Sequence, residues 1–333
     1  MQVNVVGAGA WGTALGAIAA ADESPVTLWA REPQVAGEIN QAHTNSVFLP
    51  GVSLPSSLRA TCRLEDVARA DAILLVTPAQ HLREAAARLA PHIAPSTILI
   101  ICAKGIERGT DALLSDALRE AAPGAVPAVL SGPSFAGEVA RGSPTAITLA
   151  IADPRGPELL QRLGRATFRP YLSDDLIGAQ IGGAVKNVLA IACGIVEGKG
   201  LGQSARAALI TRGFAEMSRF AVRLGARAET LGGLSGLGDL VLTCTSTQSR
   251  NYSLGVALGR GETLDHALAA HNGIAEGAFT AAALKERAAL VGVEMPISQA
   301  VDGVLTGALT VDDAIQGLLT RPFTAENTTP PRV

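Results

Sequence analysis

Apolar residues in the first half of the chain fall into short continuous runs that alternate with longer helix-forming stretches. A continuous run such as 72–76 is typical of a parallel strand that is covered on both faces. Strands are predicted over 3–6, 26–29, 72–76, 97–102, 128–131, 146–151 and 168–172. Helices are predicted between them over 10–21, 32–42, 80–90, 111–122 and 157–166. This alternation predicts an α/β domain over residues 1–176, with the doubly wound parallel sheet of the Rossmann type.

The second half is rich in Ala, Leu and Gly and contains no convincing strand. Helices are predicted over 183–196, 206–224, 253–259, 263–270, 280–291, 298–306 and 311–319. We therefore expect an all-α second domain over residues 177–333. A chain of 333 residues agrees with two domains, because single hydrophobic cores stop growing beyond about 250–300 residues.

Composition narrows the class of function. Apolar residues make up 48% of the chain and charged residues 17%, which is enough to bury a large core and excludes a disordered chain. The net charge of −3 does not favour binding to nucleic acid or to an anionic membrane. Acidic ligands would have to be met by a few placed cations.

Targeting and metal-binding patterns point to an intracellular location. Residues 1–21 carry no charge, but they lack the positive start of a signal peptide and are interrupted by glycines. The most apolar later stretch carries Lys186 and several glycines, so no stable membrane insertion is expected. The four cysteines have no metal-ligand spacing, which favours a reducing compartment. We expect a cytoplasmic protein, and a homodimer only because two-fold dimers are the commonest assemblies.

The sequence Gly7-Ala8-Gly9-Ala10-Trp11-Gly12 fits the pattern G-x-G-x-x-G. It follows a predicted strand and opens a predicted helix, which is the context of a dinucleotide-binding turn. Gly7 would make the tight turn, Gly9 would admit the pyrophosphate, and Gly12 would pack helix on strand. The pyrophosphate would bind at the helix N-terminus, where free N–H groups favour anions.

Arg31 follows the second predicted strand, where NAD-binding domains normally carry an acidic residue for the ribose 2′-hydroxyl. A guanidinium there suits a 2′-phosphate, so NADPH is the favoured cofactor. Glu32 comes next and leaves NADH open. The alternative for Arg31 is a solvated residue at the start of a helix.

Two isolated charges stand out in the second half. Lys186 is the only charged residue between Asp175 and Glu197, in an apolar helical stretch. Desolvation lowers the pKa of such a lysine toward neutrality, which suits a general base; the alternative is a lysine that reaches solvent. Asp239 is the only charge between 229 and 250, and it could pair with Lys186, bind a substrate hydroxyl, or cap a helix.

Three further segments predict contacts to a ligand. Ser249-Arg250-Asn251 places a fork-shaped cation among short polar donors, as in phosphate-binding groups. Lys104-Gly105 and Gly132-Pro133-Ser134 each follow a predicted strand, where ligands bind in open α/β sheets. None of the five histidines lies in an obvious motif with an aspartate, so none is assigned as the base.

With these motifs assembled, the chain resembles the bacterial type of NAD(P)-dependent glycerol-3-phosphate dehydrogenase over about residues 3–321. The glycine fingerprint is shared with many families. Three later motifs are more specific in their order and spacing: Gly183-Ala184-Val185-Lys186-Asn187-Val188, Gly236-Leu237-Gly238-Asp239-Leu240 and Ser249-Arg250-Asn251. The segments Lys104-Gly105-Ile106-Glu107 and Leu130-Ser131-Gly132-Pro133-Ser134-Phe135-Ala136 agree with it.

The resemblance implies reversible reduction of dihydroxyacetone phosphate to sn-glycerol 3-phosphate, a precursor of glycerophospholipids, with Lys186 as the proton acceptor. It implies substrate contacts from Lys104, Gly132, Ser134, Lys186, Asp239, Ser249, Arg250 and Asn251. It implies cofactor contacts from Gly7, Gly9, Ala10, Trp11, Gly12, Arg31, Lys104, Ala136, Arg250, Ile274 and Glu276. Ala10 stands where the family often has Ser, so a side-chain contact to the cofactor is lost. Ile274 replaces the family's Val.

Two other functions stay open from the sequence. One is another two-domain dehydrogenase acting on a sugar acid or keto acid, against which Ser249-Arg250-Asn251 argues. The other is a cofactor-sensing module that has lost catalysis, against which the presence of Lys186 and Asp239 argues. Turnover of dihydroxyacetone phosphate with NADPH would separate all three.

Overall fold

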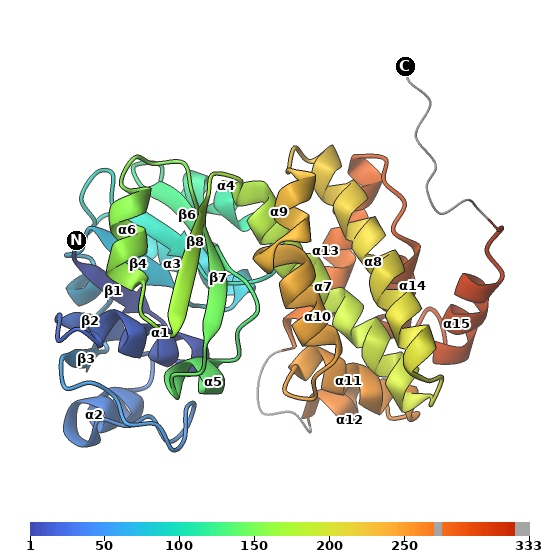
Figure 1. Ribbon diagram of the computed structural model, residues 1–333, viewed down its shortest axis with the longest axis horizontal. Helices are drawn as coiled ribbons and strands as arrows, with labels where there is room; N and C mark the ends of the chain where they lie inside the picture. The colour runs from blue at the N-terminus through green and yellow to red at the C-terminus, as the bar shows by residue number, and fades with distance from the viewer. Residues whose placement is uncertain (270–274, 324–333) are drawn as a thin grey trace.

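The computed structural model describes residues 1–269 and 275–323 (Figure 1). The N-terminal half contains an eight-stranded sheet in the order β3-β2-β1-β4-β5-β6-β7-β8. The reversal of strand order between β1 and β4 is that of a doubly wound fold, so the predicted fold class is confirmed. The strands are β1 Val3–Val6, β2 Val26–Trp29, β3 Leu58–Thr61, β4 Ala72–Leu75, β5 Ile98–Ile101, β6 Val126–Ser131, β7 Thr145–Ile151 and β8 Phe168–Ser173.

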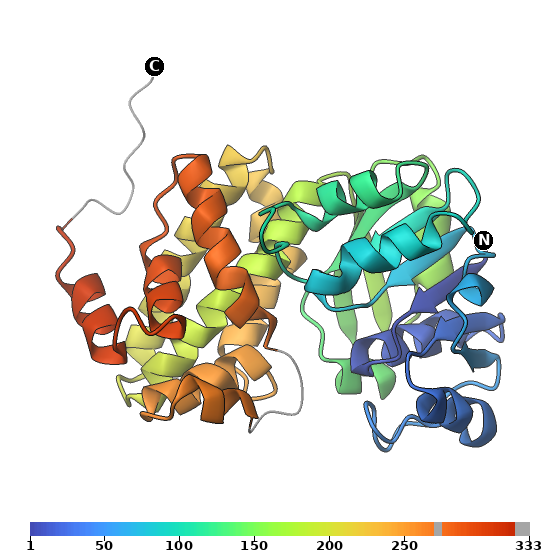
Figure 2. The same ribbon diagram turned by 180° about the vertical axis from the view of Figure 1, so that it is seen from behind.

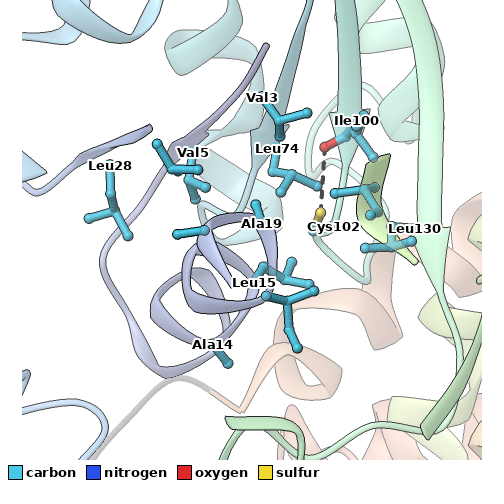
Figure 3. Packing of buried hydrophobic residues seen from close by; sticks show 14 of the residues in the cluster. Val3, Val5, Ala14, Leu15, Ala19, Leu28, Leu74, Ile100, Cys102 and Leu130 are labelled. Atoms are coloured by element: carbon cyan, nitrogen blue, oxygen red, sulfur yellow. Dashed lines mark hydrogen bonds between the residues drawn. The ribbon is translucent and has the colours of Figure 1, made fainter. Parts of the chain in front are cut away.

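Helices cover both faces of this sheet, because the central strands are apolar on both sides. In β4, Leu74 belongs to a core cluster with Leu15 of α1, whereas Leu75 belongs to a second cluster with Leu82 of α3. Figure 3 shows the first cluster, with Leu15 and Ala19 facing the sheet. The helices of this half are α1 Ala10–Ala20, α2 Pro33–Ala42, α3 Leu82–Leu89, α4 Leu114–Ala121, α5 Ala136–Ala140 and α6 Gly156–Leu163, with short 3-10 turns at Leu64–Val67 and Ala79–His81.

The sheet departs from the prediction of a parallel sheet at one pair. β7 runs antiparallel to β6, with Ser131 opposite Thr148, and β8 runs parallel to β7. The connection between β6 and β7 contains only the five-residue helix α5, which is too short to cross over the sheet and return the chain in parallel. The prediction is therefore wrong for β7 and β8. The short strand β3 and the short helix α5 of this half were not predicted.

The C-terminal half is helical, as predicted, and lies beside the sheet-containing half in both views (Figures 1 and 2). Most of the other helices pack against its long central helix, α7. The helices are α7 Leu176–Gly198, α8 Gln203–Arg223, α9 Ala228–Gly232, α10 Asp239–Cys244, α11 Arg250–Gly259, α12 Leu264–Ala269, α13 Glu276–Leu290, α14 Pro296–Leu305 and α15 Val311–Leu319, with a π-helical turn at Leu234–Gly238.

Helix α7 begins at Leu176, seven residues before the predicted start at 183. Asp175 caps it, because its Oδ1 accepts from the N–H of Gly178 at 2.8 Å. Among the described helices, α7 is the one long and apolar enough to cross a membrane by length and composition, and its most apolar window is wholly buried inside the protein. Its apolarity is therefore that of a core helix.

Candidate active site

The glycine turn between β1 and α1 has the geometry of an anion-binding turn. Gly7 has φ of +113°, a conformation that glycine adopts readily, and its N–H donates to the carbonyl oxygen of Trp29 at 3.0 Å. A Cβ at Gly12 would lie 1.8 Å from the carbonyl oxygen of Gly7, so no larger residue fits. A Cβ at Gly9 would meet no atom within 4 Å. The turn thus leaves open space at the N-terminus of α1, which fits a dinucleotide pyrophosphate.

Asn45 holds this turn in place and was not singled out from the sequence. It is fully buried, and its Nδ2 donates to the carbonyl oxygen of Ala8 at 2.9 Å and to Thr13 Oγ1 at 2.8 Å. It lies beyond α2, so nothing local in the sequence shows that its amide reaches back to the first turn. A buried Asn with both contacts fixes the loop against the glycine turn.

The residues predicted to contact the dinucleotide on this side lie around that turn. Ala10 and Trp11 open α1, and Ala136 opens α5, which packs against α1. Arg31 follows β2, and its Nε and Nη2 both bond Glu32 Oε1, at 2.8 and 2.6 Å. Among the described residues, the hydrogen-bond partner of the Arg31 side chain is therefore the next residue, Glu32.

A second group of predicted residues meets where the two halves of the chain touch. Asp239, at the start of α10, is fully buried and accepts from Lys186 of α7 at 2.5 Å through Oδ1. Its Oδ2 accepts from Lys104, which follows β5, at 2.7 Å. One carboxylate thus joins two ammonium groups from different halves of the chain. Pairing with Lys186 was one of the alternatives for Asp239, whereas the bond to Lys104 was not predicted.

The environment of Lys186 shifts its proton affinity. Burial is the main cause that lowers the pKa of Lys186 to about 8; the charge of Lys104 acts in the same direction and Asp239 in the opposite one. The hydroxyl of Thr243, one helical turn after Asp239, accepts from Lys186 at 2.8 Å. Thr243 was not predicted as a site residue; its i+4 spacing from Asp239 places both on one face of α10.

The carbonyl oxygen of Gly132, at the end of β6, accepts from Lys104 at 3.0 Å and from Ser134 Oγ at 3.1 Å. Two predicted segments that are 28 residues apart, Lys104 and Gly132-Pro133-Ser134, therefore lie together. A buried chain of amides joins them to α11, because Asn251 Nδ2 donates to Asn187 Oδ1 at 3.0 Å, and Asn187 donates to the carbonyl oxygen of Lys104 at 3.2 Å.

Ser249 and Arg250 occupy the first positions of α11. Ser249 Oγ caps the helix by accepting from the N–H of Tyr252 at 3.2 Å. The side chain of Arg250 is exposed and makes no hydrogen bond within residues 1–269 and 275–323. Its positive charge lowers the pKa of Glu276, against the stronger effect of burial, which raises that pKa. Arg250 therefore lies close enough to Glu276 for its charge to affect that carboxyl group, and its guanidinium is exposed.

Glu276, the first residue of α13, closes the site from the other side. Its Oε1 accepts from the N–H of Ala79, just beyond β4, at 3.0 Å. A cleft of about 480 Å³ opens beside this contact, between the segment after β4 and α13, with Arg108 and Phe279 in its wall. Ile274, also predicted to contact the cofactor, lies outside the described residues.

The predicted residues thus form two groups at the carboxyl edge of the sheet: the glycine turn with Arg31, and the cluster around Asp239. No histidine takes part in the hydrogen bonds of the Asp239 cluster, and the described part of the chain holds no group of side chains suited to a metal. A glycine turn that fits a dinucleotide, together with a buried lysine whose pKa is lowered to about 8, is the pattern expected of a nicotinamide-dependent dehydrogenase with a helical second domain.

Comparison with known proteins gives the family. The model of the NAD-dependent glycerol-3-phosphate dehydrogenase N-terminus matches residues 2–156, and that of the C-terminus matches residues 175–316. The chain belongs to the family of NAD-dependent glycerol-3-phosphate dehydrogenases, and the resemblance found in the sequence is confirmed.

Relatives match along nearly the whole chain. The glycerol-3-phosphate dehydrogenase (NAD(P)+) of Parvibaculum lavamentivorans is 58% identical, with 98% of both chains covered. That of Hyphomonas neptunium is 57% identical, again with 98% of both covered. The crystal structure of glycerol-3-phosphate dehydrogenase from Coxiella burnetii is 40% identical with a TM-score of 0.92, covering 96% of this chain and 98% of that one.

Proposed function

We propose that this chain interconverts dihydroxyacetone phosphate and sn-glycerol 3-phosphate with NAD(P)H, and so feeds glycerophospholipid synthesis. The observation that carries this proposal is the buried Lys186–Asp239–Lys104 cluster at the edge of the dinucleotide-binding sheet. Two ammonium groups share one carboxylate, so the cluster keeps one net positive charge. That charge suits an anionic substrate and a carbonyl oxygen that becomes negative during reduction.

The cofactor supplies a hydride to the carbonyl carbon. Gly7, Gly9 and Gly12 would hold its pyrophosphate, because the turn leaves open space at the start of α1. We propose NADPH as the preferred form, read at its 2′-phosphate by Arg31, with NADH also accepted. The remaining contacts would come from Ala10, Trp11, Lys104, Ala136, Arg250, Ile274 and Glu276.

The substrate would lie between Arg250 and the Lys186–Asp239–Lys104 cluster. Arg250 would bind the phosphate, since its guanidinium is exposed at the start of α11 and presents a planar fork of donors. The reacting oxygen would face the lysine cluster at the other end. The residues proposed to contact the substrate are Lys104, Gly132, Ser134, Lys186, Asp239, Ser249, Arg250 and Asn251.

Lys186 would transfer the proton. In reduction, its ammonium donates one proton to the carbonyl oxygen as the hydride reaches carbon; in oxidation, its neutral amine takes the hydroxyl proton. A pKa of about 8 lets both forms exist near neutral pH. Asp239 would hold the ammonium in place, and the Thr243 hydroxyl would orient it, because both bond the same nitrogen.

The decisive experiment measures turnover of dihydroxyacetone phosphate with NADPH. The reaction is monitored through the decrease in NADPH absorbance. We expect steady turnover that is reversible with sn-glycerol 3-phosphate and NADP+. Sugar acids and keto acids without phosphate should be poor substrates. Cofactor binding without turnover of any of these compounds would instead support a sensing module.

The localisation, domain boundary and oligomeric state of the protein are proposed from its composition and from general properties of proteins. We propose a cytoplasmic enzyme that binds neither nucleic acid nor membrane, with α7 as the core helix of its second domain. We propose that the domain boundary lies at 176/177, next to the first residue of α7. A homodimer is proposed because two-fold dimers are the commonest assemblies.

A further inference from the structure

β2 ends beside the glycine turn, since the N–H of Gly7 donates to the carbonyl oxygen of Trp29 at 3.0 Å. In this fold, the ribose next to the adenine lies beyond the end of the second strand. The residues that meet the ribose 2′ position are therefore those that follow Trp29. Two of them, Arg31 and Glu32, carry opposite charges and bond each other.

Arg31 and Glu32 differ in how firmly they are placed. The side chain of Arg31 is 80% exposed, whereas that of Glu32 is 27% exposed and stands at the N-cap of α2. Two guanidinium nitrogens of Arg31, Nε and Nη2, bond the same carboxylate oxygen, Oε1. Within the described residues, Oε2 of Glu32 accepts no hydrogen bond. The carboxylate is thus the more buried partner and has a spare acceptor, and the guanidinium is the more exposed partner.

We propose that Glu32 is a second determinant of cofactor choice: it accepts the 2′-hydroxyl of NADH, and it competes with the 2′-phosphate of NADPH for Arg31. A carboxylate with a free oxygen is a good acceptor for a ribose hydroxyl. A 2′-phosphate carries up to two negative charges and would stand beside the same carboxylate. NADPH must therefore draw Arg31 away from Glu32, whereas NADH can bind with the pair intact.

The neighbouring strand also has a cation after its end. Arg63 follows β3, the strand paired with β2, and its Nε lies 3.6 Å from Glu65 and 3.8 Å from Asp66. Arg31 is the better placed cation for the 2′-phosphate because it follows β2 itself, and its availability depends on Glu32. This inference rests on the proposed function, in which Arg31 reads that phosphate.

Glu32→Gln tests the inference, because it keeps the size of the side chain and removes its charge. Dissociation constants of NADPH and NADH are measured by fluorescence titration, and kcat/KM is measured with dihydroxyacetone phosphate. A hydrogen bond to a charged group predicts roughly tenfold weaker NADH binding. Release of Arg31 and loss of repulsion predict NADPH binding that is tighter by a similar factor. Glu294→Gln, between α13 and α14 in the helical half and 82% exposed, changes the net charge equally and should alter neither constant by more than about twofold.

Arg31→Ala, in the same titrations, separates this inference from the proposed function. Selective loss of NADPH affinity in Arg31→Ala supports the proposed reading of the 2′-phosphate. If Glu32→Gln then leaves the ratio of the two dissociation constants unchanged, the role of Glu32 is overturned while that of Arg31 stands. Equal loss of both cofactors in Arg31→Ala contradicts NADPH recognition by Arg31, and a fall in NADH affinity in Glu32→Gln would still support Glu32 as the ribose acceptor.

Discussion

The chemistry of the proposed site depends on one carboxylate, that of Asp239, which is shared by two lysines. Asp239 gives one oxygen to Lys186 and the other to Lys104, so each ammonium is neutralised only in part. Removing two such groups from water penalises the charged form of Lys186, and the second lysine adds to that effect. A buried ammonium with a pKa of about 8 can donate a proton at neutral pH and recover it.

Lys186→Ala should lower kcat by about 10²–10⁴-fold, the range for removing a positioned acid or base. Binding of NADPH, measured by fluorescence titration, should change little. In the wild type, alcohol oxidation needs the neutral amine, so its rate should rise as pH increases through about 8; ketone reduction needs the ammonium and should fall over the same interval. Lys199→Ala, at the exposed end of α7, serves as the control. Near-normal kcat in Lys186→Ala would move the proton-transfer role to Lys104.

Arg250→Ala should raise the KM for dihydroxyacetone phosphate steeply. It should also lower kcat, because the binding energy of the phosphate positions the carbonyl. Unphosphorylated dihydroxyacetone should be a poor substrate of the wild type and should be little affected by the substitution. Arg260→Ala, just beyond the other end of α11, removes the same charge at a distance. An equal loss of kcat/KM with both substrates would show that Arg250 acts mainly by binding the cofactor or by stabilising the fold.

At the scale of elements, α7 and α11 pack with their backbones in direct contact. A Cβ at Gly194 of α7 would lie 2.1 Å from the carbonyl oxygen of Tyr252, and a Cβ at Gly255 of α11 would lie 2.1 Å from that of Ile191. Gly198 and Gly259 repeat this contact one turn later. The close approach fixes α11 against α7, and with it Arg250 and Asn251 relative to Lys186.

Gly255→Ala should therefore destabilise the protein although alanine favours helices. The added methyl group has no space unless the helices separate, and overpacking of this kind costs about 1–3 kcal/mol. Gly317→Ala in α15 is the matched control, since a Cβ there meets nothing within 4 Å. It should be stabilising by up to about 1 kcal/mol, from helix propensity alone. Urea unfolding followed by circular dichroism measures both, and equal effects would contradict the close packing.

Other glycines of α7 limited what the sequence could predict about the elements. Alternation of apolar runs predicts most strands and helices, because buried central strands need apolar residues on both faces. The first turns of α7 contain Gly178, Gly182 and Gly183, which locally argue against helix and become necessary only against the packed neighbours. β3 is four residues long with Arg59 at its second position, so no apolar pattern marks it.

At the scale of the whole molecule, the two halves meet through polar contacts between distant residues. Lys104 bonds Asp239, Asn187 bonds the backbone of Lys104, and Glu276 bonds the backbone of Ala79. Isolated charges in apolar segments, such as Lys186 and Asp239, could be singled out from the sequence because a lone buried charge requires a partner. Asn45 and Thr243 could not, because a neutral polar residue is ordinary in any segment and its importance appears only with its tertiary contacts.

Glu216 gives a test of how buried charge limits the stability of the whole protein. It lies in α8 with 2% of its surface exposed and accepts from the N–H of Ile297, at the start of α14, at 2.7 Å. Burial raises its pKa from 4.5 to about 7, although that hydrogen bond and the charge of Arg219 oppose the shift. The folded protein therefore binds a proton at Glu216 more tightly than the unfolded chain does.

A raised folded-state pKa contributes stability that is fully present below pH 4.5 and lost as pH rises through about 7. A shift of this size corresponds to about 3 kcal/mol. Glu216→Gln keeps an acceptor for the N–H of Ile297 but cannot ionise, so its free energy of unfolding relative to the wild type should increase by up to that amount between pH 5 and pH 8. Urea unfolding at both pH values measures the difference, with Glu229→Gln on exposed α9 as the control that should show none. If the variant and the wild type changed in parallel over this interval, Glu216 would be ionised in the folded protein already at pH 5, and the hydrogen bonds at the start of α14 would outweigh its burial.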